Sequence, residues 1–114
     1  MDERRNRRSN EPEMALSLLL SACRNRGGFD ALVLSDDMGL LVAASTQPGA
    51  NVDVEEVAAI LPTPDQRQSV RRLRTTVFGV DGHTLYVGAI GGDKSRFAPE
   101  LQATLRGVRR ILAA

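Results

Sequence analysis

Hydrophobic positions near the start of the chain recur with the period of a helix. In residues 14–26 they fall at i, i+3, i+4 and i+7, which predicts an amphipathic helix with one apolar stripe. This stripe consists of Leu16, Leu19, Leu20 and Cys23. Asn10 is a suitable N-cap for the helix, and Gly27 and Gly28 are suitable residues to end it. The charged residues 1–10 are predicted to form a disordered tail, and residues 11–114 to form the domain.

Two pairs of apolar runs predict two β-hairpins. The first pair, residues 29–35 and 40–45, is apolar at nearly every position, which predicts strands that are buried on both faces. The second pair is residues 73–80 and 84–90. It flanks Asp81-Gly82, a dipeptide typical of two-residue hairpin turns. The sheet is therefore expected to be covered on both sides.

Two further helices are predicted, one between the hairpins and one at the end of the chain. Asp53 is a suitable N-cap with Glu56 three residues later, and Pro62 and Pro64 end this middle helix. Its apolar face consists of Val54, Val57, Ala58 and Leu61. The apolar face of the last helix consists of Leu101, Leu105, Val108 and Leu112.

Composition and charge narrow the class of protein. The chain has 114 residues, 42% hydrophobic and 25% charged, with a formal net charge of +1, as in one ordinary globular domain without a general attraction to nucleic acid. Cys23 is the only cysteine and His83 the only histidine, so we expect no metal site. No membrane-spanning segment is expected either, and the interpretation is a cytoplasmic protein. The alternative is a lipoprotein processed at Cys23, because Leu20-Ser21-Ala22-Cys23 resembles a lipoprotein cleavage box.

No catalytic or cofactor-binding motif is recognised, so the chain is not expected to be an enzyme. Residues 88–95 (GAIGGDKS) are rich in glycine, but the glycine spacing differs from that of a phosphate-binding loop and Asp93 would repel a phosphate. We interpret this segment as a flexible turn. The acidic pair Asp36 and Asp37 is interpreted as part of a hairpin turn.

One cluster of arginines is conspicuous, formed by Arg67, Arg71, Arg72 and Arg74. Such a cluster is typical of a charged strand edge that discourages aggregation. It would equally suit a docking surface for an acidic partner. A nucleic-acid or anionic-surface binding domain that uses residues 67–74 is therefore the alternative function.

The element order is helix, hairpin, helix, hairpin, helix. Together with the segments FDALVLSDDMGLLVAAS and VFGVDGHTLYVGAIGG, this order resembles the Roadblock/dynein light chain family, in particular its bacterial GTPase-regulating type. The resemblance covers about residues 14–114. It implies an α/β fold of α+β type, a Roadblock/profilin-like three-layer sandwich. A central antiparallel sheet of four to five strands would carry the first and last helices on one face and the middle helix on the other.

The resemblance also implies a function. Members of this family are usually dimers, of one chain or of two paralogues, that join their sheets edge to edge and bring their middle helices together. They regulate or scaffold Ras-like small GTPases and carry no catalytic machinery or cofactor. The implied interface here consists of Val54, Val57, Ala58, Leu61, Arg71, Arg72, Leu73, Arg74 and Thr75. The chain departs from the pattern in its short middle helix, and a fifth strand is expected within residues 66–72 or not at all.

Overall fold

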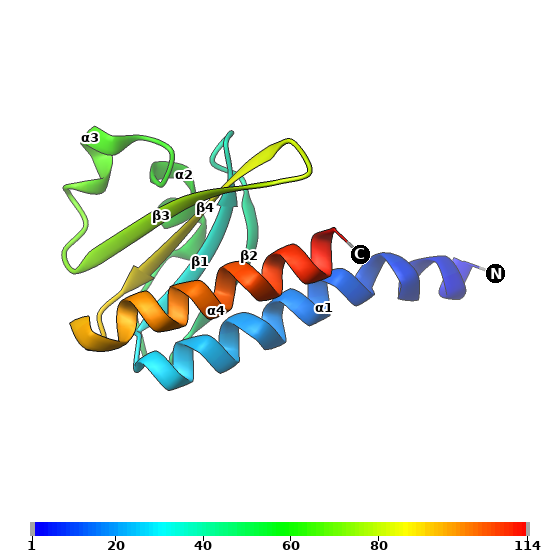
Figure 1. Ribbon diagram of the computed structural model, residues 1–114, viewed down its shortest axis with the longest axis horizontal. Coiled ribbons are helices and arrows are strands. Elements are labelled where there is room, and N and C mark those ends of the chain that lie inside the picture. The colour runs from blue at the N-terminus through cyan, green and yellow to red at the C-terminus, as the bar shows by residue number, and fades with distance from the viewer. Residues whose placement is uncertain (1, 114) are drawn as a thin grey trace.

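A computed structural model describes residues 2–113, with side chains from residue 11 on. Its centre is an antiparallel sheet of four strands in the order β2-β1-β4-β3 (Figure 1). The strands are β1 (Ala31–Asp36), β2 (Leu41–Thr46), β3 (Leu73–Val80) and β4 (His83–Ile90). β1 and β4 are therefore central, and β2 and β3 form the two edges.

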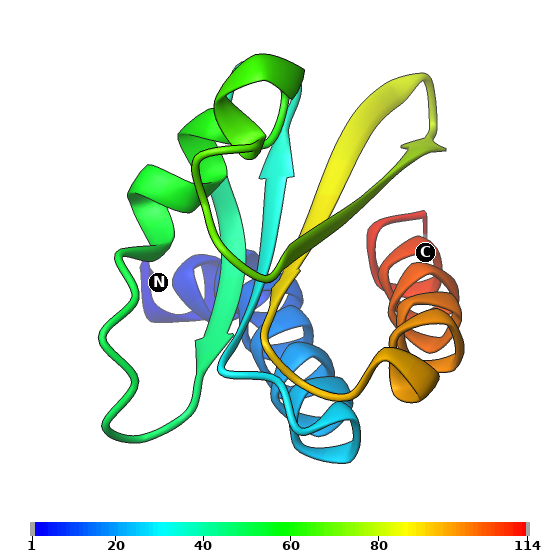
Figure 2. The same ribbon diagram turned by 90° about the vertical axis from the view of Figure 1, so that its left-hand side faces the viewer.

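Helices cover both faces of this sheet. α1 (Asp2–Gly27) and α4 (Lys94–Leu112) pack on one face, and α2 (Val54–Ile60) packs on the other, over β1 and β2 (Figure 2). The predicted three-layer fold class is confirmed. Residues 66–72 contain no strand: they include the end of the short helix α3 (Pro64–Arg67), followed by turns. The optional fifth strand is thus absent from the described chain, and Pro64 begins a helix there because its fixed φ suits a first turn.

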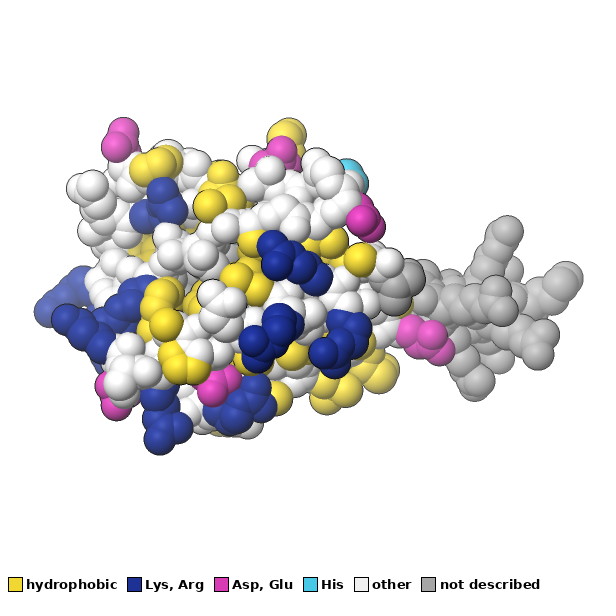
Figure 3. All heavy atoms as spheres, in the orientation of Figure 1, with side chains coloured by type: hydrophobic (Ala, Val, Ile, Leu, Met, Phe, Trp, Pro, Cys, Tyr) yellow, Lys and Arg dark blue, Asp and Glu magenta, His cyan; other side chains and the backbone are white. Residues whose placement is uncertain are grey.

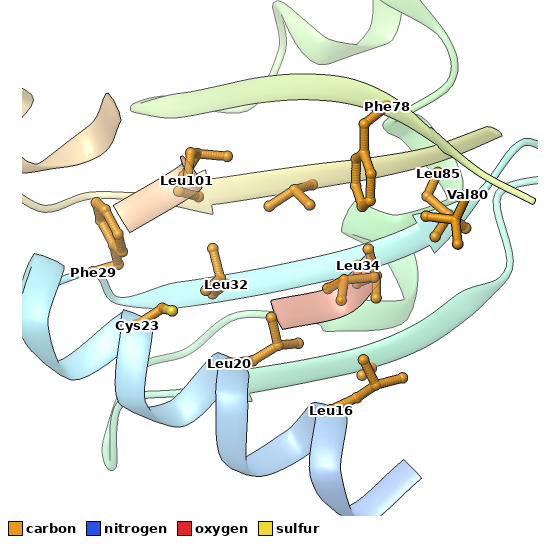
Figure 4. Close-up of a cluster of buried hydrophobic side chains, with 14 residues drawn as sticks. Leu16, Leu20, Cys23, Phe29, Leu32, Leu34, Phe78, Val80, Leu85 and Leu101 are labelled. Carbon is orange, nitrogen blue, oxygen red and sulfur yellow. The ribbon is translucent and has the colours of Figure 1, made fainter. Parts of the chain in front are cut away.

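The larger hydrophobic core lies between the sheet and the α1–α4 layer (Figure 4). Leu16, Leu20 and Cys23 of α1 are buried against it, as the predicted stripe requires. A second, smaller cluster lies under α2 around Val33. Leu32 and Val33 are both fully buried, but on opposite faces of the sheet. β1 is covered on both faces, and its consecutive residues are therefore apolar.

α1 and α4 run antiparallel, side by side (Figure 1). Arg26 Nε lies 3.0 Å from Glu100 Oε1, and Gly107 faces the side chain of Leu19. The absence of a side chain at Gly107 allows the two helices to approach closely.

The backbone of α1 is already helical at Asp2, so the predicted start at Asn10 is wrong. Pro12 then lies inside the helix, although proline removes one main-chain donor there. The division into a tail and a domain at residues 10 and 11 stays a prediction, because the side chains of residues 1–10 lie outside the described part of the structure.

Two predicted local signals are confirmed. Asp81 and Gly82 both have positive φ, 49° and 80°, as a type I′ hairpin turn requires. Asp53 caps α2 by accepting a hydrogen bond from the Glu56 N–H at 3.2 Å. α2 ends at Ile60, before Pro62, so it has only seven residues.

Candidate interaction surface

Strand β3 carries a free main-chain edge, because β4 is its only neighbour in the sheet within residues 2–113. Leu73, Arg74 and Thr75, all predicted interface residues, lie on this strand and are half-buried. Arg71 and Arg72 are exposed immediately before it. The second half of the predicted interface thus lies on an open sheet edge, as an edge-to-edge contact needs.

Arg72 sets the path by which the chain enters β3. Its φ of 61° is in the left-handed region, and its carbonyl accepts a hydrogen bond from the Gly91 N–H at 3.2 Å. Its guanidinium lies 3.8 Å from Asp30 Oδ2, with both side chains largely exposed. An ion pair this exposed contributes little, so the backbone contact is the more important constraint.

The arginines of the sequence cluster do not form one surface. Arg67 donates to Thr75 Oγ1 at 2.9 Å, and Thr75 shares its strand face with Leu73, which packs toward α2. Arg74 lies on the opposite face, with Cζ 5.7 Å from the ring centre of Phe97 in α4. The structure therefore places these side chains on opposite faces of the sheet. This separation is unfavourable for binding one nucleic-acid backbone, whose phosphates would need the basic side chains on the same surface.

The apolar face of α2 is directed at the sheet. Val57, Ala58 and Leu61 are 6%, 0% and 0% exposed and pack with Val33. These three predicted interface residues are core residues in the described chain, because the seven-residue helix uses its whole apolar face to cover β1 and β2. Of the four predicted positions, Val54 is half-buried and retains the most accessible surface.

The structure reveals one further residue that the sequence did not single out. Val77, in the middle of β3, is 56% exposed, and it stands opposite the half-buried Tyr86 of β4. α2 is too short to reach this part of the sheet, so the expected covering of both faces is incomplete over β3. The alternation in LRTTV places Val77 on the same strand face as Leu73 and Thr75, but only the position of α2 shows that this face is uncovered at Val77.

A shallow hollow of about 410 Å³ lies between α2 and the segment that leads into β3. Asp53 and Glu56 line its α2 side, and Arg71 lines the opposite side. The remaining lining residues are Asn51, Val52, Val57, Ile60, Ser69, Val70 and Ile90. This hollow lies next to the segment that precedes β3 and adds to the surface available to a partner there.

The glycine-rich segment before α4 has a structural role. Asp93 accepts a hydrogen bond from the Ser95 N–H at 3.0 Å and so caps α4, and this bond lowers the pKa of the Asp93 carboxyl below its ordinary value. Nearby, the hydrogen bond to Glu100 raises the pKa of the Arg26 guanidinium. The α4 N-terminus is thus satisfied by a carboxylate of the chain itself.

Among the described residues there is neither a candidate metal site nor a candidate membrane span. Among the side chains that the structure describes, from residue 11 to residue 113, no group of three or more Asp, Glu, His or Cys residues is placed to hold a metal ion. Between residues 2 and 113, no helix is both long and apolar enough to cross a bilayer.

The fold is similar to that of solved MglB structures. The "gliding protein" MglB from Thermus thermophilus superposes with a TM-score of 0.69 at 14% sequence identity, covering 89% of this chain and 90% of that one. An MglB structure described as having a tetrameric arrangement gives 0.70 at 14% identity, with coverages of 89% and 90%. Myxococcus xanthus MglB gives 0.66 at 10% identity, with coverages of 90% and 91%.

At these identities the likeness concerns the fold. No protein-family model matches the chain, and a search of curated proteins found no similar sequence.

Proposed function

We propose that this chain is a non-catalytic interaction module that dimerises through β3 and regulates or scaffolds a Ras-like small GTPase in the cytoplasm. The observation that carries the proposal is the free edge of β3 with the exposed Val77 at its centre. Two antiparallel copies of β3 would satisfy each other's main-chain groups and cover this side chain.

The fold supports the same proposal. Its likeness to MglB, one structure of which has a tetrameric arrangement, agrees with a chain that associates with copies of itself. The family resemblance of the sequence supplies the small GTPase as the partner. Pairing with a paralogue would use the same edge.

The core supports the cytoplasmic interpretation over lipoprotein processing at Cys23. Cleavage there would remove Leu16 and Leu20, two of the largest fully buried side chains. The remaining sheet would expose the core that these residues fill, at a cost of several kcal/mol (about 1.5–3 per buried leucine).

The decisive experiment measures the oligomeric state by light scattering after gel filtration at tens of micromolar. Wild type should have twice the mass of the chain, and Val77→Lys should be a folded monomer because it places a charge in the contact. Thr84→Lys, an exposed site on the internal strand β4, is the matched control and should remain dimeric. A monomeric wild type would refute dimerisation.

The GTPase is tested separately. A Ras-like GTPase purified from the source cell and loaded with a fluorescent GTP analogue should bind the wild-type dimer, as measured by anisotropy. Binding should fall at least tenfold with Val77→Lys if the dimer forms the docking surface. If none of the cell's Ras-like GTPases binds, the regulatory role is refuted, and the proposal that the chain dimerises is unaffected.

A further inference from the structure

The second free edge of the sheet, β2, lacks the protection that edge strands normally have. All residues from Leu41 to Thr46 are uncharged, and none is proline. Natural proteins usually guard an edge with charges, proline or a covering segment, because an open row of N–H and C=O groups pairs readily with another strand. β3 has Arg74 within it and two arginines before it, whereas β2 has nothing comparable.

Exposed apolar side chains surround this edge. Met14 and Leu18 of α1 are 65% and 67% exposed, and Met38 and Leu40 of the β1–β2 turn are 79% and 64% exposed. Leu41 begins β2 itself and is 37% exposed. These five are most of the large hydrophobic side chains that are exposed in the described chain, and Figure 3 shows hydrophobic side chains along the α1 border of the molecule.

Hydrogen bonds place the flank of α1 beside β2. Met14, Leu18 and Ser21 lie at i, i+4 and i+7 and therefore share one side of the helix. Ser21 Oγ lies 3.0 Å from Ser45 Oγ, and Arg24 Nε donates to the same oxygen at 2.9 Å. The exposed pair Met14 and Leu18 thus continues the side of α1 that borders the edge strand.

The other side of the edge is bordered by α2, which carries one exposed carboxylate on this flank. Ala59 lies against the β1–β2 turn, since a Cβ on Gly39 would be 3.0 Å from the Ala59 carbonyl oxygen. Glu55 is one turn earlier on the same flank and is exposed. Glu56, in contrast, lines the hollow on the opposite flank.

A lone strand fits this edge better than a second copy of the chain. Paired strands lie about 4.8 Å apart, whereas packed helices need roughly 8–10 Å between their axes. Because α1 lies directly on the edge strand, two copies paired through β2 would bring their α1 helices too close together. An extended segment meets no such obstacle, and α1 offers it an apolar surface.

We propose that the free edge of β2 binds an extended segment of a partner protein. The segment adds as a fifth strand, with apolar side chains toward Met14 and Leu18 and a basic side chain toward Glu55. Strand addition of this kind takes its affinity from main-chain hydrogen bonds and its specificity from alternate side chains. The site lies on the edge opposite to β3 and does not depend on dimerisation.

The test uses a fluorescein-labelled synthetic peptide that alternates valine with lysine, and binding is measured by anisotropy. Wild type should bind saturably. Thr46→Pro, which removes an N–H that does not pair with β1, should abolish binding. Successive N–H groups of a strand point to opposite sides. The Gln47 N–H donates to the Asp30 carbonyl oxygen and so points toward β1, which means that the preceding Thr46 N–H points away from β1. Amide exchange measured by NMR should show Ala44 and Thr46 protected when the peptide is bound.

Side-chain variants test the two flanks. Leu18→Ser should weaken binding about tenfold, as expected for the loss of one buried leucine contact. Glu55→Lys should weaken it to a similar extent because it repels lysine, whereas the matched control Glu56→Lys should change it less than about twofold. Equal effects of the two charge reversals would overturn the assigned side-chain directions, and with them the proposed chemistry of the segment.

Two binding results would overturn the site itself: no binding of the peptide to wild type, or peptide binding that survives Thr46→Pro. A change in oligomeric state with Thr46→Pro would also overturn it, because β2 would then pair with a second copy of the chain. Val77→Lys separates this proposal from dimerisation. It should leave peptide affinity unchanged while it disrupts a dimer formed through β3. If Val77→Lys abolished peptide binding, the peptide would bind at the β3 edge and the proposed β2 site would be wrong.

Discussion

The side chain of Leu61 packs directly on the backbone of Gly88. A Cβ at Gly88 would lie 2.7 Å from Leu61 Cδ2 and 3.1 Å from Leu73 Cδ1, so this position on β4 has no room for a side chain. The contact fixes the distance between the end of α2 and the sheet. It also explains why Leu61 is unavailable to a second chain.

Gly88→Ala should therefore destabilise the fold by about 1–3 kcal/mol, the usual cost of overpacking a core. The measurement is urea unfolding followed by circular dichroism. Gly79→Ala is the matched control on β3: its nearest neighbour would be 3.8 Å away and its φ is ordinary, so stability should stay within about 0.5 kcal/mol. Equal stability of both variants would show that α2 adjusts freely.

Gly107 provides a prediction in which two effects oppose each other. Alanine is favoured over glycine inside a helix by about 1 kcal/mol, but a Cβ here would lie 2.6 Å from Leu19 Cδ1. Gly107→Ala should therefore destabilise wild type, because the half-buried Leu19 side chain or α1 itself must move. In a Leu19→Ala background the same substitution should become stabilising by up to about 1 kcal/mol. Unfolding of the four proteins of this cycle gives the answer, and an unchanged sign would refute close helix packing.

The hairpins and a sheet buried on both faces could be predicted from the sequence because they depend on local signals, whereas the placement of the helices on the two faces followed from the family resemblance. Asp81-Gly82 and Asp53 act within a few residues, and the alternative for residues 66–72 without a strand was the correct one. The sequence was less informative about whether the apolar face of α2 is directed at its own sheet or at a partner. An amphipathic stripe is equally expected of a helix that covers its own sheet and of one that covers a partner, so Leu61 could be assigned only from burial.

The exposure of side chains at the two sheet edges could not be predicted from the hydrophobic pattern of the sequence either. Val77 is uncovered because α2 ends at Ile60, and the position of that helix over β1 and β2 follows from packing rather than from any local motif. Met14 and Leu18 likewise resemble ordinary apolar positions of a core helix. The predicted stripe already left them out, but only the three-dimensional structure shows that both are exposed on the side of α1 that borders β2.

Arg24 is expected to stabilise the contact between α1 and β2. It is 8% exposed and donates to Ser45 Oγ, Asn25 Oδ1 and, at 3.4 Å, the Phe29 carbonyl oxygen. Arg24→Met keeps much of the apolar stem but removes every donor, so it should cost about 1–3 kcal/mol. Ser45→Ala should cost less, because Arg24 retains its other acceptors. Urea unfolding of both variants checks this order, and the reverse order would contradict it.

Asp93 provides a prediction that depends on pH. Its pKa is lowered below 3.8, chiefly by the hydrogen bond from the Ser95 N–H, so the folded protein favours the carboxylate. A lowered folded pKa stabilises the protein fully above the ordinary pKa, and this stabilisation is lost as pH falls through the folded value. Asp93→Ala should therefore lower the melting temperature at pH 7, and the difference from wild type should shrink below about pH 3.8. Asp93→Asn retains a neutral cap acceptor and should show little of this pH dependence. A difference between wild type and Asp93→Ala that stays constant from pH 7 to pH 2.5, measured by thermal unfolding, would contradict a charged cap on α4.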